Sequence, residues 1–505
     1  MFAITALKML YWLGRISSMD NFILCGMQFG DEGKGTFVDY LIYNQNIDCI
    51  VKYNGGSQAS HTVITPSRIV HKFSQLGSGM FSEKCHTYLT DNMVINIENL
   101  LVELDVFSSK TKIPIPELIN RIHIHENCFI VTPYHKLINK LRELSKGDNR
   151  RGTVGTGVSE VQYLLNEQKK FPCEQPLGLM IKDIYNHYNN NSIIERLQAL
   201  QEYVLSFYLQ NQEIISKNIP DELKENLSKE ISFLLHPKAF FTIASHYITE
   251  FKYARKEFNL QKCLYSNYDS AIRTYHNAIY EGSQGLLIDN VYGIKPNTTF
   301  LDTTNSFALS LSHANDVTHK IGITKAFMSR HGLGIFPTES STVSNQISDE
   351  NQNFSFWNGK IRFGWFDSIL VRYAQSINKV NELYLSALDK LDDFDTIKVC
   401  NEYIYSGTID SEFKKIFSYY LSENGQVIIT DIKENHKDLN KYLSNCIPKY
   451  ICVNGWKSNI TQISNKSYLP TKCLEYIKLL EKLVCIPITI VSVGPTRENK
   501  IKLTV

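Results

Sequence analysis

A glycine-rich loop between a short apolar run and a helical segment constrains the fold more than any other feature. Residues 22–25 are apolar, four glycines fall between positions 26 and 35, and residues 36–42 have helical apolar spacing. A loop placed between a strand and a helix lets backbone N–H groups approach an anion at the helix N-terminus. The sequence therefore predicts a phosphate site at this position, within an α/β fold.

Bulk composition narrows the class of protein. The chain has 505 residues, of which 43% are hydrophobic and 21% are charged, so a large buried core is expected. Lys and Arg total 53 against 51 Asp and Glu, a formal net charge of +2. Such a balance gives no global attraction to nucleic acid or to an anionic membrane, and we expect neither as a partner.

The cysteines and the first residues bear on the cellular compartment. The eleven cysteines show no zinc-like C-x-x-C spacing, which favours free thiols in a reducing, cytoplasmic setting. Residues 1–18 contain Lys8 and Arg15, no acid, and an apolar run at 10–13 that is too short to span a bilayer. We expect residues 1–20 to be an N-terminal extension, with a targeting segment as the alternative.

Strand and helix patterns alternate along most of the chain. Apolar, strand-like runs follow the loop and return later, at 49–53, 94–97, 279–280, 321–327, 383–388, 397–399 and 488–493. Residues 184–262 are instead polar with helical spacing. We predict a large, mainly parallel central sheet flanked by helices, with a helical elaboration at 184–262 and smaller peripheral segments.

The charged residues of the loop indicate its chemistry. Lys34 supplies a point charge for a phosphate, but Gln28 and Gly35 stand where a Walker A loop has a glycine and a hydroxyl residue. The fold is therefore predicted to be P-loop-NTPase-like without a Walker A motif. Asp31 is a candidate metal ligand or base, because a carboxylate beside a lysine and a helix start stays ionised. The alternative is a solvated turn without chemistry.

The hexamer 30–35, Gly-Asp-Glu-Gly-Lys-Gly, resembles the signature near the start of adenylosuccinate synthetases. Further matches follow in family order, at Gly55–Thr62 (GGSQASHT), Glu281–Gly285 (EGSQG), 336–339 (FPTE), 364–367 (GWFD), 388–389 (LD), 455–456 (GW) and 494–497 (GPTR). The resemblance covers about residues 21–503 and implies a single domain over 21–505.

This resemblance implies a GTP-dependent ligase that joins L-aspartate to inosine monophosphate through a 6-phosphoryl intermediate, giving adenylosuccinate in purine biosynthesis. Asp31 would remove the purine N1 proton, and His61 would act as general acid at the transferring phosphoryl group. Lys34 would neutralise phosphate charge, and Gln284 would hydrogen-bond the purine 6-oxygen region. The resemblance also implies a Mg²⁺ cofactor and a homodimer.

The resemblance further assigns binding residues by position. The GTP site is predicted at Gly30, Glu32, Gly33, Gly35, Thr62, Asp389, Gly494 and Pro495. The purine monophosphate site is predicted at Asp31, Gln58, Thr153, Gln284 and Thr299. The amino-acid substrate is predicted at Lys360 and Arg362, and the metal at Asp31 and Ser60. Ala387 stands where the family has a lysine over the guanine, which reduces apolar packing there.

Two segments depart from the family pattern. Residues 153–157 read Thr-Val-Gly-Thr-Gly where the family has Thr-Thr-Gly-Arg-Gly, and the family's partner-subunit arginine has no match near 176–179. Arg150 and Arg151 lie just upstream, which predicts a rearranged phosphate clamp. In 354–363 both threonines of the family's aspartate loop are absent.

A third departure replaces the family's His-Asn and Gly by Ser57, Gln58 and Ser60. These departures leave three hypotheses open. The first is the standard ligase, favoured by the complete set of reactive residues. The second is the same chemistry on another purine monophosphate or amine, and the third is a catalytically silent GTP-binding protein.

Overall fold

The structure is a computed structural model that describes residues 20–153, 155–170, 177–185, 190–254, 259–272, 275, 277–312, 317–347, 356–357 and 359–503. The predicted extension at 1–20 lies outside these ranges except for Asp20, which begins strand β1. The ten cysteines in these ranges are free thiols, as predicted. None of the described helices is long and apolar enough to cross a membrane.

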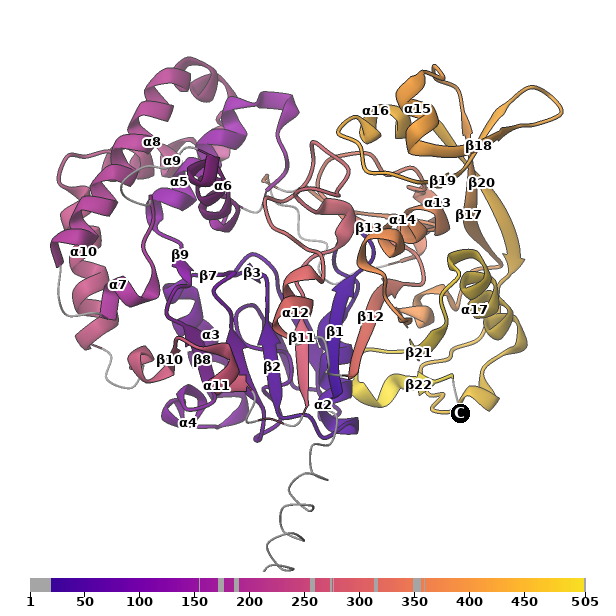
Figure 1. Ribbon diagram of the computed structural model, residues 1–505, viewed down its shortest axis with the longest axis horizontal. Coiled ribbons are helices and arrows are strands. Elements are labelled where there is room, and N and C mark those ends of the chain that lie inside the picture. Colours follow the sequence, from indigo (N-terminus) through magenta and orange to yellow (C-terminus); the bar gives the residue numbers. More distant parts are fainter. Residues whose placement is uncertain are drawn as a thin grey trace, which may run out of the picture.

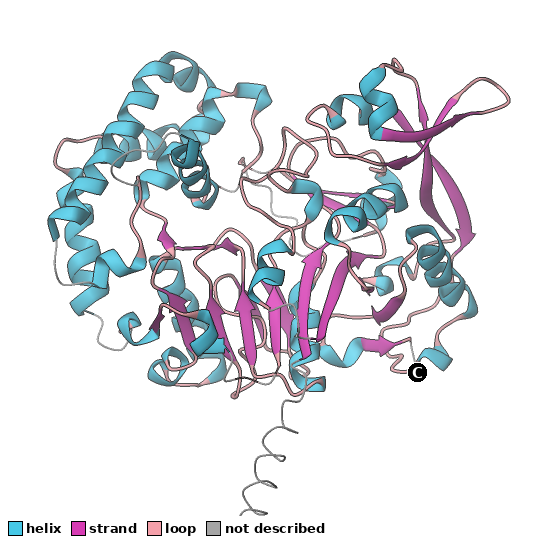
Figure 2. Cartoon of the chain, in the orientation of Figure 1, coloured by secondary structure: helices cyan, strands magenta, loops and turns pink. Residues whose placement is uncertain are grey.

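A ten-stranded sheet forms the centre of the molecule (Figures 1 and 2). Its strands run in the order β10 (Leu264–Tyr265), β8 (Ile122–His125), β6 (His86–Leu89), β2 (Cys49–Lys52), β11 (Ala278–Glu281), β1 (Asp20–Gly26), β12 (Val317–Lys325), β16 (Glu382–Ser386), β21 (Ile488–Ser492) and β22 (Lys500–Lys502). Every neighbouring pair is parallel except β21 with β22. The predicted mainly parallel sheet is confirmed.

Burial on both faces explains why the central strands are continuous apolar runs. All of β2 and β11 is buried, as is β1 after its first residue. Helices flank the sheet, among them α2 (Lys34–Asn44), α3 (Ile97–Thr111), α14 (Ser368–Asn378) and α17 (Thr471–Val484). Helix α2 follows β1 through the glycine-rich loop, so the predicted strand, loop and helix are confirmed.

Two predicted strands do not belong to the central sheet. In 94–97 the strand is β7 (Met93–Ile95), which pairs with β3 (Gly55–Gly56) and β9 (Phe129–Ile130). This strand ends because the Asn96 side chain accepts a hydrogen bond from Asn99 N and starts helix α3. Residues 397–399 lie in β17 (Thr396–Tyr405), whose antiparallel neighbours are β19 (Val427–Ile432) and β20 (Cys446–Asn454).

That second sheet also contains β15 (Phe366–Asp367) and β18 (Phe417–Leu421), and it lies beyond β12 and α14 from the main helical block (Figure 1). Two hairpins, β4 (His61–Ile64) with β5 (Val70–Phe73) and β13 (Met328–His331) with β14 (Ile361–Gly364), also stand apart from the central sheet. These smaller units carry two of the predicted site residues, because His61 begins β4 and Arg362 lies in β14.

The opposite side of the molecule is helical (Figure 1). Within 184–262, the described residues form α8 (Asn190–Asn218), α9 (Asp221–Leu234), α10 (Ala239–Ser245) and the π-helix η2 (His246–Ala254), all outside the sheet. They pack with α5 (Pro133–Ser145) and α6 (Val158–Lys170). Arg151 and Thr153 lie between α5 and α6, so this helical block positions them.

Arg142 joins three helices of the block. Its Nε lies 3.1 and 3.0 Å from the two carboxylate oxygens of Glu160 in α6, and its Nη2 donates to Tyr203 Oη in α8 at 3.0 Å. The guanidinium also stacks on the Tyr163 ring. The Glu160 side chain is only 1% exposed, and Arg142 is the main compensation for its charge, with smaller contributions from Lys146 and Asn139.

Replacing Arg142 by methionine is expected to lower the free energy of unfolding by about 3 to 5 kcal/mol, because the Glu160 carboxylate stays buried without its partner. Urea unfolding followed by circular dichroism measures the change. The control is Lys229→Met, which removes an exposed ion pair with Glu225 whose side chains are 72% and 80% exposed. Equal midpoints for the two variants would contradict the assignment.

Candidate active site

A buried ammonium connects the turns that follow β1 and β11. Lys34 Nζ donates to Glu32 Oε2 and to the backbone oxygen of Gln284, at 2.6 Å each. Glu32 Oε1 in turn accepts from the backbone N–H groups of Gln28 and Gly30, at 3.0 Å each. These bonds fold the loop onto the neighbouring turn at the carboxyl edge of the parallel sheet, where α/β folds place ligands.

This arrangement changes how two predicted residues act. Glu32 is fully buried and its carboxylate serves the loop and Lys34, so any contact that Glu32 makes to GTP rests on its backbone. Lys34 has three N–H donors and uses two here, which leaves one for a phosphate. Because the two charges cancel, the backbone N–H groups of the loop supply much of its attraction for anions.

Lys34, Glu32 and the backbone of Gln284 form the floor of the site, and a cavity of about 290 Å³ opens above it. It brings together nine of the predicted residues: Gly30, Asp31, Lys34, Gln58, Ser60, His61, Thr153, Gln284 and Thr299. The remaining lining includes Asn139, Arg151, Thr156, Ser159, Thr298 and His331. Residues separated by about 300 positions in the chain therefore share one polar cavity.

The other predicted GTP residues lie outside this lining. Asp389 follows β16 and the pair Gly494 and Pro495 follows β21, and these two strands are parallel neighbours. Two hydrogen bonds connect this part of the edge to the loop, Ser386 Oγ to Glu32 O at 2.6 Å and Thr36 Oγ1 to Pro495 O at 3.1 Å. Gly33 and Gly35 begin α2, and Thr62 is an exposed residue of β4.

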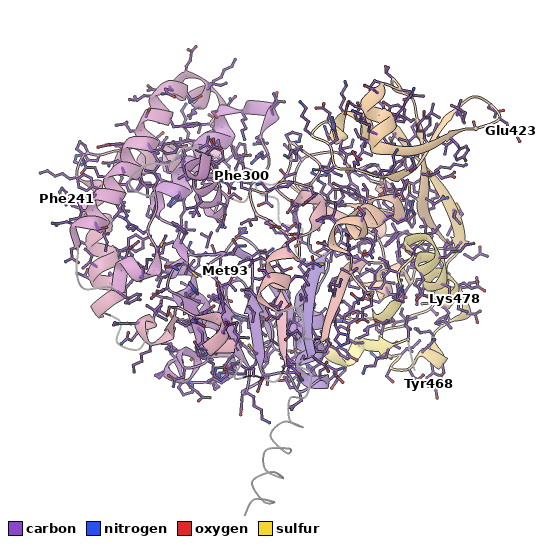
Figure 3. All side chains as sticks on the ribbon, in the orientation of Figure 1. Met93, Phe241, Phe300, Glu423, Tyr468 and Lys478 are labelled. Atoms are coloured by element: carbon purple, nitrogen blue, oxygen red, sulfur yellow. The ribbon has the colours of Figure 1, made fainter. Side chains whose placement is uncertain are left out.

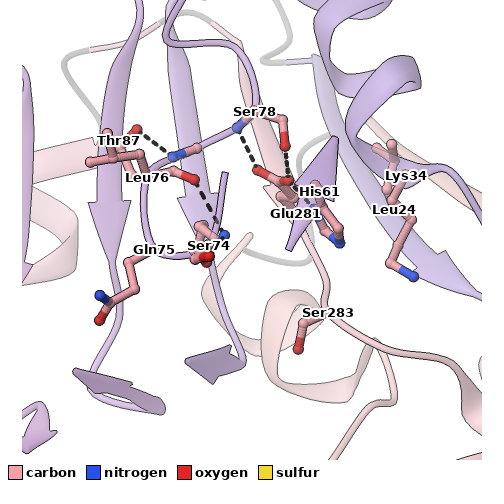
Figure 4. Close-up of polar contacts among 12 residues, drawn as sticks. Leu24, Lys34, His61, Ser74, Gln75, Leu76, Ser78, Thr87, Glu281 and Ser283 are labelled. Atoms are coloured by element: carbon pink, nitrogen blue, oxygen red, sulfur yellow. Dashed lines mark hydrogen bonds and ion pairs between the residues drawn. The ribbon is translucent and has the colours of Figure 1, made fainter. Parts of the chain in front are cut away.

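His61 is held from below by a carboxylate. Its Nδ1 lies 2.5 Å from Glu281 Oε1, and Glu281 also accepts from the backbone N–H and the hydroxyl of Ser78 (Figure 4). Burial lowers the pKa of His61, against the opposing effect of Glu281. Our sequence analysis missed Glu281 and Ser78 as site residues, although Glu281 begins a family motif.

The two upstream arginines take different positions. Arg151 lines the cavity, and its guanidinium lies over the ring of Phe300, 3.8 Å from the centroid (Figure 3 labels Phe300). Arg150 does not line the cavity, and its guanidinium lies over the Phe356 ring at 4.4 Å. Only one of the pair is therefore available to a ligand in the cavity.

Several polar atoms of the cavity walls are buried without a hydrogen-bond partner among the described residues. They are Gln58 Oε1 and Nε2, Arg151 Nη1, Gln284 Oε1, Thr298 Oγ1 and His331 Nδ1. A buried polar atom without a partner costs about 1 to 3 kcal/mol. Such a concentration at one cavity indicates that a polar ligand completes these bonds.

The residues predicted for the amino-acid substrate do not line the cavity. Lys360 is exposed. Arg362 donates to Glu339 at 2.6 Å, to Gly332 O at 3.1 Å and to Gly334 O at 2.8 Å. The guanidinium of Arg362 is therefore engaged within the protein, and the loop residues at 348–355 and 358 lie outside the described ranges.

Asp31 stands at the cavity wall with its side chain 52% exposed, and His331 Nε2 lies 3.4 Å from its Oδ2. His331 belongs to none of the motifs identified in the sequence. Among the described residues no cluster of three His, Cys, Asp or Glu side chains could hold a metal. Mg²⁺ is usually held by one or two carboxylates together with substrate phosphates, so the single accessible Asp31 carboxylate fits this ion beside a bound nucleotide.

Replacing Glu32 by glutamine and Lys34 by methionine, singly and together, tests the floor of the site. Each single change leaves a buried charge unpaired, so we expect the double variant to be less destabilised than the sum of the two, with a coupling of about 1 to 3 kcal/mol. Urea unfolding gives all four values. The exposed pair Lys415 and Glu412 serves as a control without measurable coupling. Additive losses at the buried pair would refute its role.

Comparisons with known proteins agree with this geometry. The family model for adenylosuccinate synthetase matches residues 23–501. The adenylosuccinate synthetase of Halothermothrix orenii is 27% identical over 488 residues, covering 96% of this chain and 99% of its own length. That of Chlorobium phaeovibrioides is 29% identical over 490 residues, covering 96% and 98%.

Solved structures show the same fold. The fully ligated adenylosuccinate synthetase of Plasmodium falciparum matches with a TM-score of 0.71 at 20% identity, over 96% of this chain and 99% of the other. The succinoaminodeoxyadenylate synthetase of cyanophage S-2L, bound to dGMP and dATP, matches with a TM-score of 0.53 at 12% identity, over 97% and 96%. With a family match over nearly its whole length, the chain belongs to the adenylosuccinate synthetase family of ligases.

Proposed function

We propose that this protein is a GTP-dependent ligase that joins L-aspartate to inosine monophosphate and forms adenylosuccinate. The observation that carries the proposal is the group of unpartnered polar atoms on the cavity walls, from Gln58, Arg151, Gln284, Thr298 and His331. A purine monophosphate offers a polar base edge, hydroxyls and a phosphate, which are the groups that such atoms bind.

The first half-reaction makes the purine 6-oxygen a leaving group. Asp31 accepts the N1 proton, the resulting 6-oxyanion attacks the γ-phosphorus of GTP, and GDP leaves as the bond to the β,γ-bridging oxygen breaks. The Gln284 side chain, whose Oε1 is unpartnered, lies in the same cavity to meet the base edge. Asp31 would also hold Mg²⁺ with Ser60 nearby, and the bound ion would neutralise charge on the phosphates.

The glycine-rich loop at residues 30–35 would stabilise the negative charge on the transferring phosphoryl group. The free N–H of Lys34 and the backbone N–H groups of residues 30–35 contact phosphate oxygens, and His61 donates a proton from Nε2. In the second half-reaction the aspartate amine attacks C6, and the 6-phosphoryl group leaves as phosphate. The four side chains assigned to the first half-reaction, Asp31, Lys34, His61 and Gln284, line one cavity.

We assign the guanine of GTP to the part of the sheet's carboxyl edge that follows β16 and β21. The half-buried Asp389 offers two carboxylate oxygens to the N1 and N2 donors of guanine, while Gly494 and Pro495 close over the base. The bonds from Thr36 to Pro495 and from Ser386 to Glu32 tie this edge to the phosphate loop. Because Ala387 replaces the family's lysine, we infer that discrimination against other nucleotides is weaker here.

Turnover by the purified protein tests the function directly. With GTP, Mg²⁺, inosine monophosphate and aspartate, we expect phosphate release together with a shift in purine absorbance. Asp31→Ala and His61→Ala should each lower kcat by about 10² to 10⁴. Substituting each substrate in turn separates the alternatives, because release only with another purine or amine would favour altered specificity. No release with any combination would leave a GTP-binding protein without catalysis.

We assign the phosphate of the purine monophosphate to Arg151, with Thr153 and Thr299 in the same cavity. Arg151→Met should raise the KM for the purine monophosphate by about ten- to a hundredfold, the equivalent of one charge-assisted hydrogen bond of about 1.5 to 3 kcal/mol. Arg150→Met is the matched control, because this neighbour lies over Phe356 outside the cavity. Equal effects from the two variants would refute the assignment.

A second candidate differs in the amine. Arg362 is already bound to Glu339 and to two backbone oxygens, and Lys360 is exposed. An amine with fewer carboxylates than aspartate needs fewer cations, so this observation favours including simpler amino acids and ammonia in the assay.

A further inference from the structure

We infer that Glu281 is a positioning residue that fixes the ring of His61, so that Nδ1 keeps its hydrogen and Nε2 is the ring nitrogen that takes up and releases a proton on the cavity side. This inference deepens the proposed function and rests on it for the role of His61. Glu281 does not line the cavity and is fully buried at the end of β11, so it acts only through the histidine.

The direction of the hydrogen bond determines the tautomer. An ionised carboxylate only accepts hydrogen bonds, so His61 Nδ1, 2.5 Å from Glu281 Oε1, carries a hydrogen. Burial alone raises the pKa of Glu281, but the charge of Lys52 and the hydrogen bonds from His61 and Ser78 hold it at about 2. Glu281 is therefore ionised at neutral pH, and Nε2 is the ring nitrogen left for a ligand.

Ser78 holds the carboxylate in place from the other side. Its backbone N–H donates to Glu281 Oε2 at 3.0 Å and its hydroxyl donates to Oε1 (Figure 4). Both oxygens of Glu281 are thus bound, and the carboxylate cannot rotate without losing a bond. Helix α2 approaches His61 closely at Gly35, because a Cβ at Gly35 would stand only 2.7 Å from the Cβ of His61.

The segment 74–78 is itself held rigidly. Glu103 accepts from the backbone N–H groups of Ser74, Gln75 and Leu76 at 2.8, 2.9 and 3.2 Å. Lys52 Nζ donates to the backbone oxygens of Ser74 and Leu76 at 2.7 and 3.3 Å. The carboxylate of Glu281 therefore stands on a fixed frame, which is what an orienting group needs in order to act on a catalytic ring.

A purely structural ion pair is the competing explanation. The hairpin of β4 and β5 has its own backbone pairing from His61 with Phe73 to Ile64 with Val70, so it does not depend on Glu281 to form. If the ion pair served stability alone, its removal would lower the free energy of unfolding, and kcat would not depend on the tautomer of His61. If Glu281 orients the ring, its removal changes the tautomer of His61 and lowers kcat while KM stays nearly the same.

The test compares Glu281→Gln with wild type, and with Asp367→Asn as a control that replaces a fully buried carboxyl group outside this frame by an amide. In the free protein with ¹⁵N-labelled histidine, NMR should show His61 protonated at Nδ1 in wild type and in Asp367→Asn, and a mixture of tautomers in Glu281→Gln. Turnover should fall at least tenfold in kcat for Glu281→Gln, with KM values for GTP and the purine monophosphate within about threefold.

The outcomes separate this inference from the proposed function. An unchanged His61 tautomer in Glu281→Gln, or an unchanged kcat, overturns the role of Glu281. Absence of turnover in wild type overturns the proposed function, while the NMR comparison still decides whether Glu281 orients His61. If Glu281→Gln does not fold, Glu281→Asp replaces it: this variant keeps the charge and should keep the Nδ1 tautomer, and a mixed tautomer there would also overturn the inference.

Discussion

The buried ammonium of Lys34 determines where the rest of the site can stand. It binds the Glu32 carboxylate of its own loop and the Gln284 carbonyl of the turn after β11, so two turns from adjacent strands close into one floor. Burying two opposite charges costs desolvation energy, and the pair is tolerated because both partners gain further hydrogen bonds. An anion above this floor meets backbone N–H groups and one remaining donor rather than a full positive charge.

The same construction recurs around the cavity. A carboxylate behind the cavity wall supports each of three polar elements of the lining: Glu32 binds Lys34, Glu281 binds His61, and Glu143 accepts from Gly152 N at 2.8 Å. Each accepts hydrogen bonds and leaves the opposite face of its partner free. The cavity therefore presents donors whose orientation is fixed before any ligand arrives.

Local patterns in the sequence predicted the phosphate loop and the parallel sheet, because a glycine-rich turn between a strand and a helix has few other solutions. The resemblance to the family, rather than any local pattern, supplied most of the nine residues that meet in the cavity. What the sequence could not predict depends on partners far along the chain. The pairing of Glu281 with His61 and Ser78 spans about 200 residues, and His331 reaches Asp31 only because the hairpin of β13 and β14 folds back over the loop. The strand at 94–97 ended early because one asparagine side chain capped a helix.

The two segments that depart from the family pattern contact each other. Arg150 lies over Phe356, and the indole of Trp357 lies against Gly155, where an added Cβ would be 3.7 Å from its Cδ1. Aromatic residues in the second segment therefore cover the first. With Arg150 held on Phe356, Arg151 is the one that lies over Phe300 and reaches the cavity. A change in either segment alters the support of the other, so the two departures from the family pattern are better understood as one coupled change above the floor that Lys34 and Glu32 form.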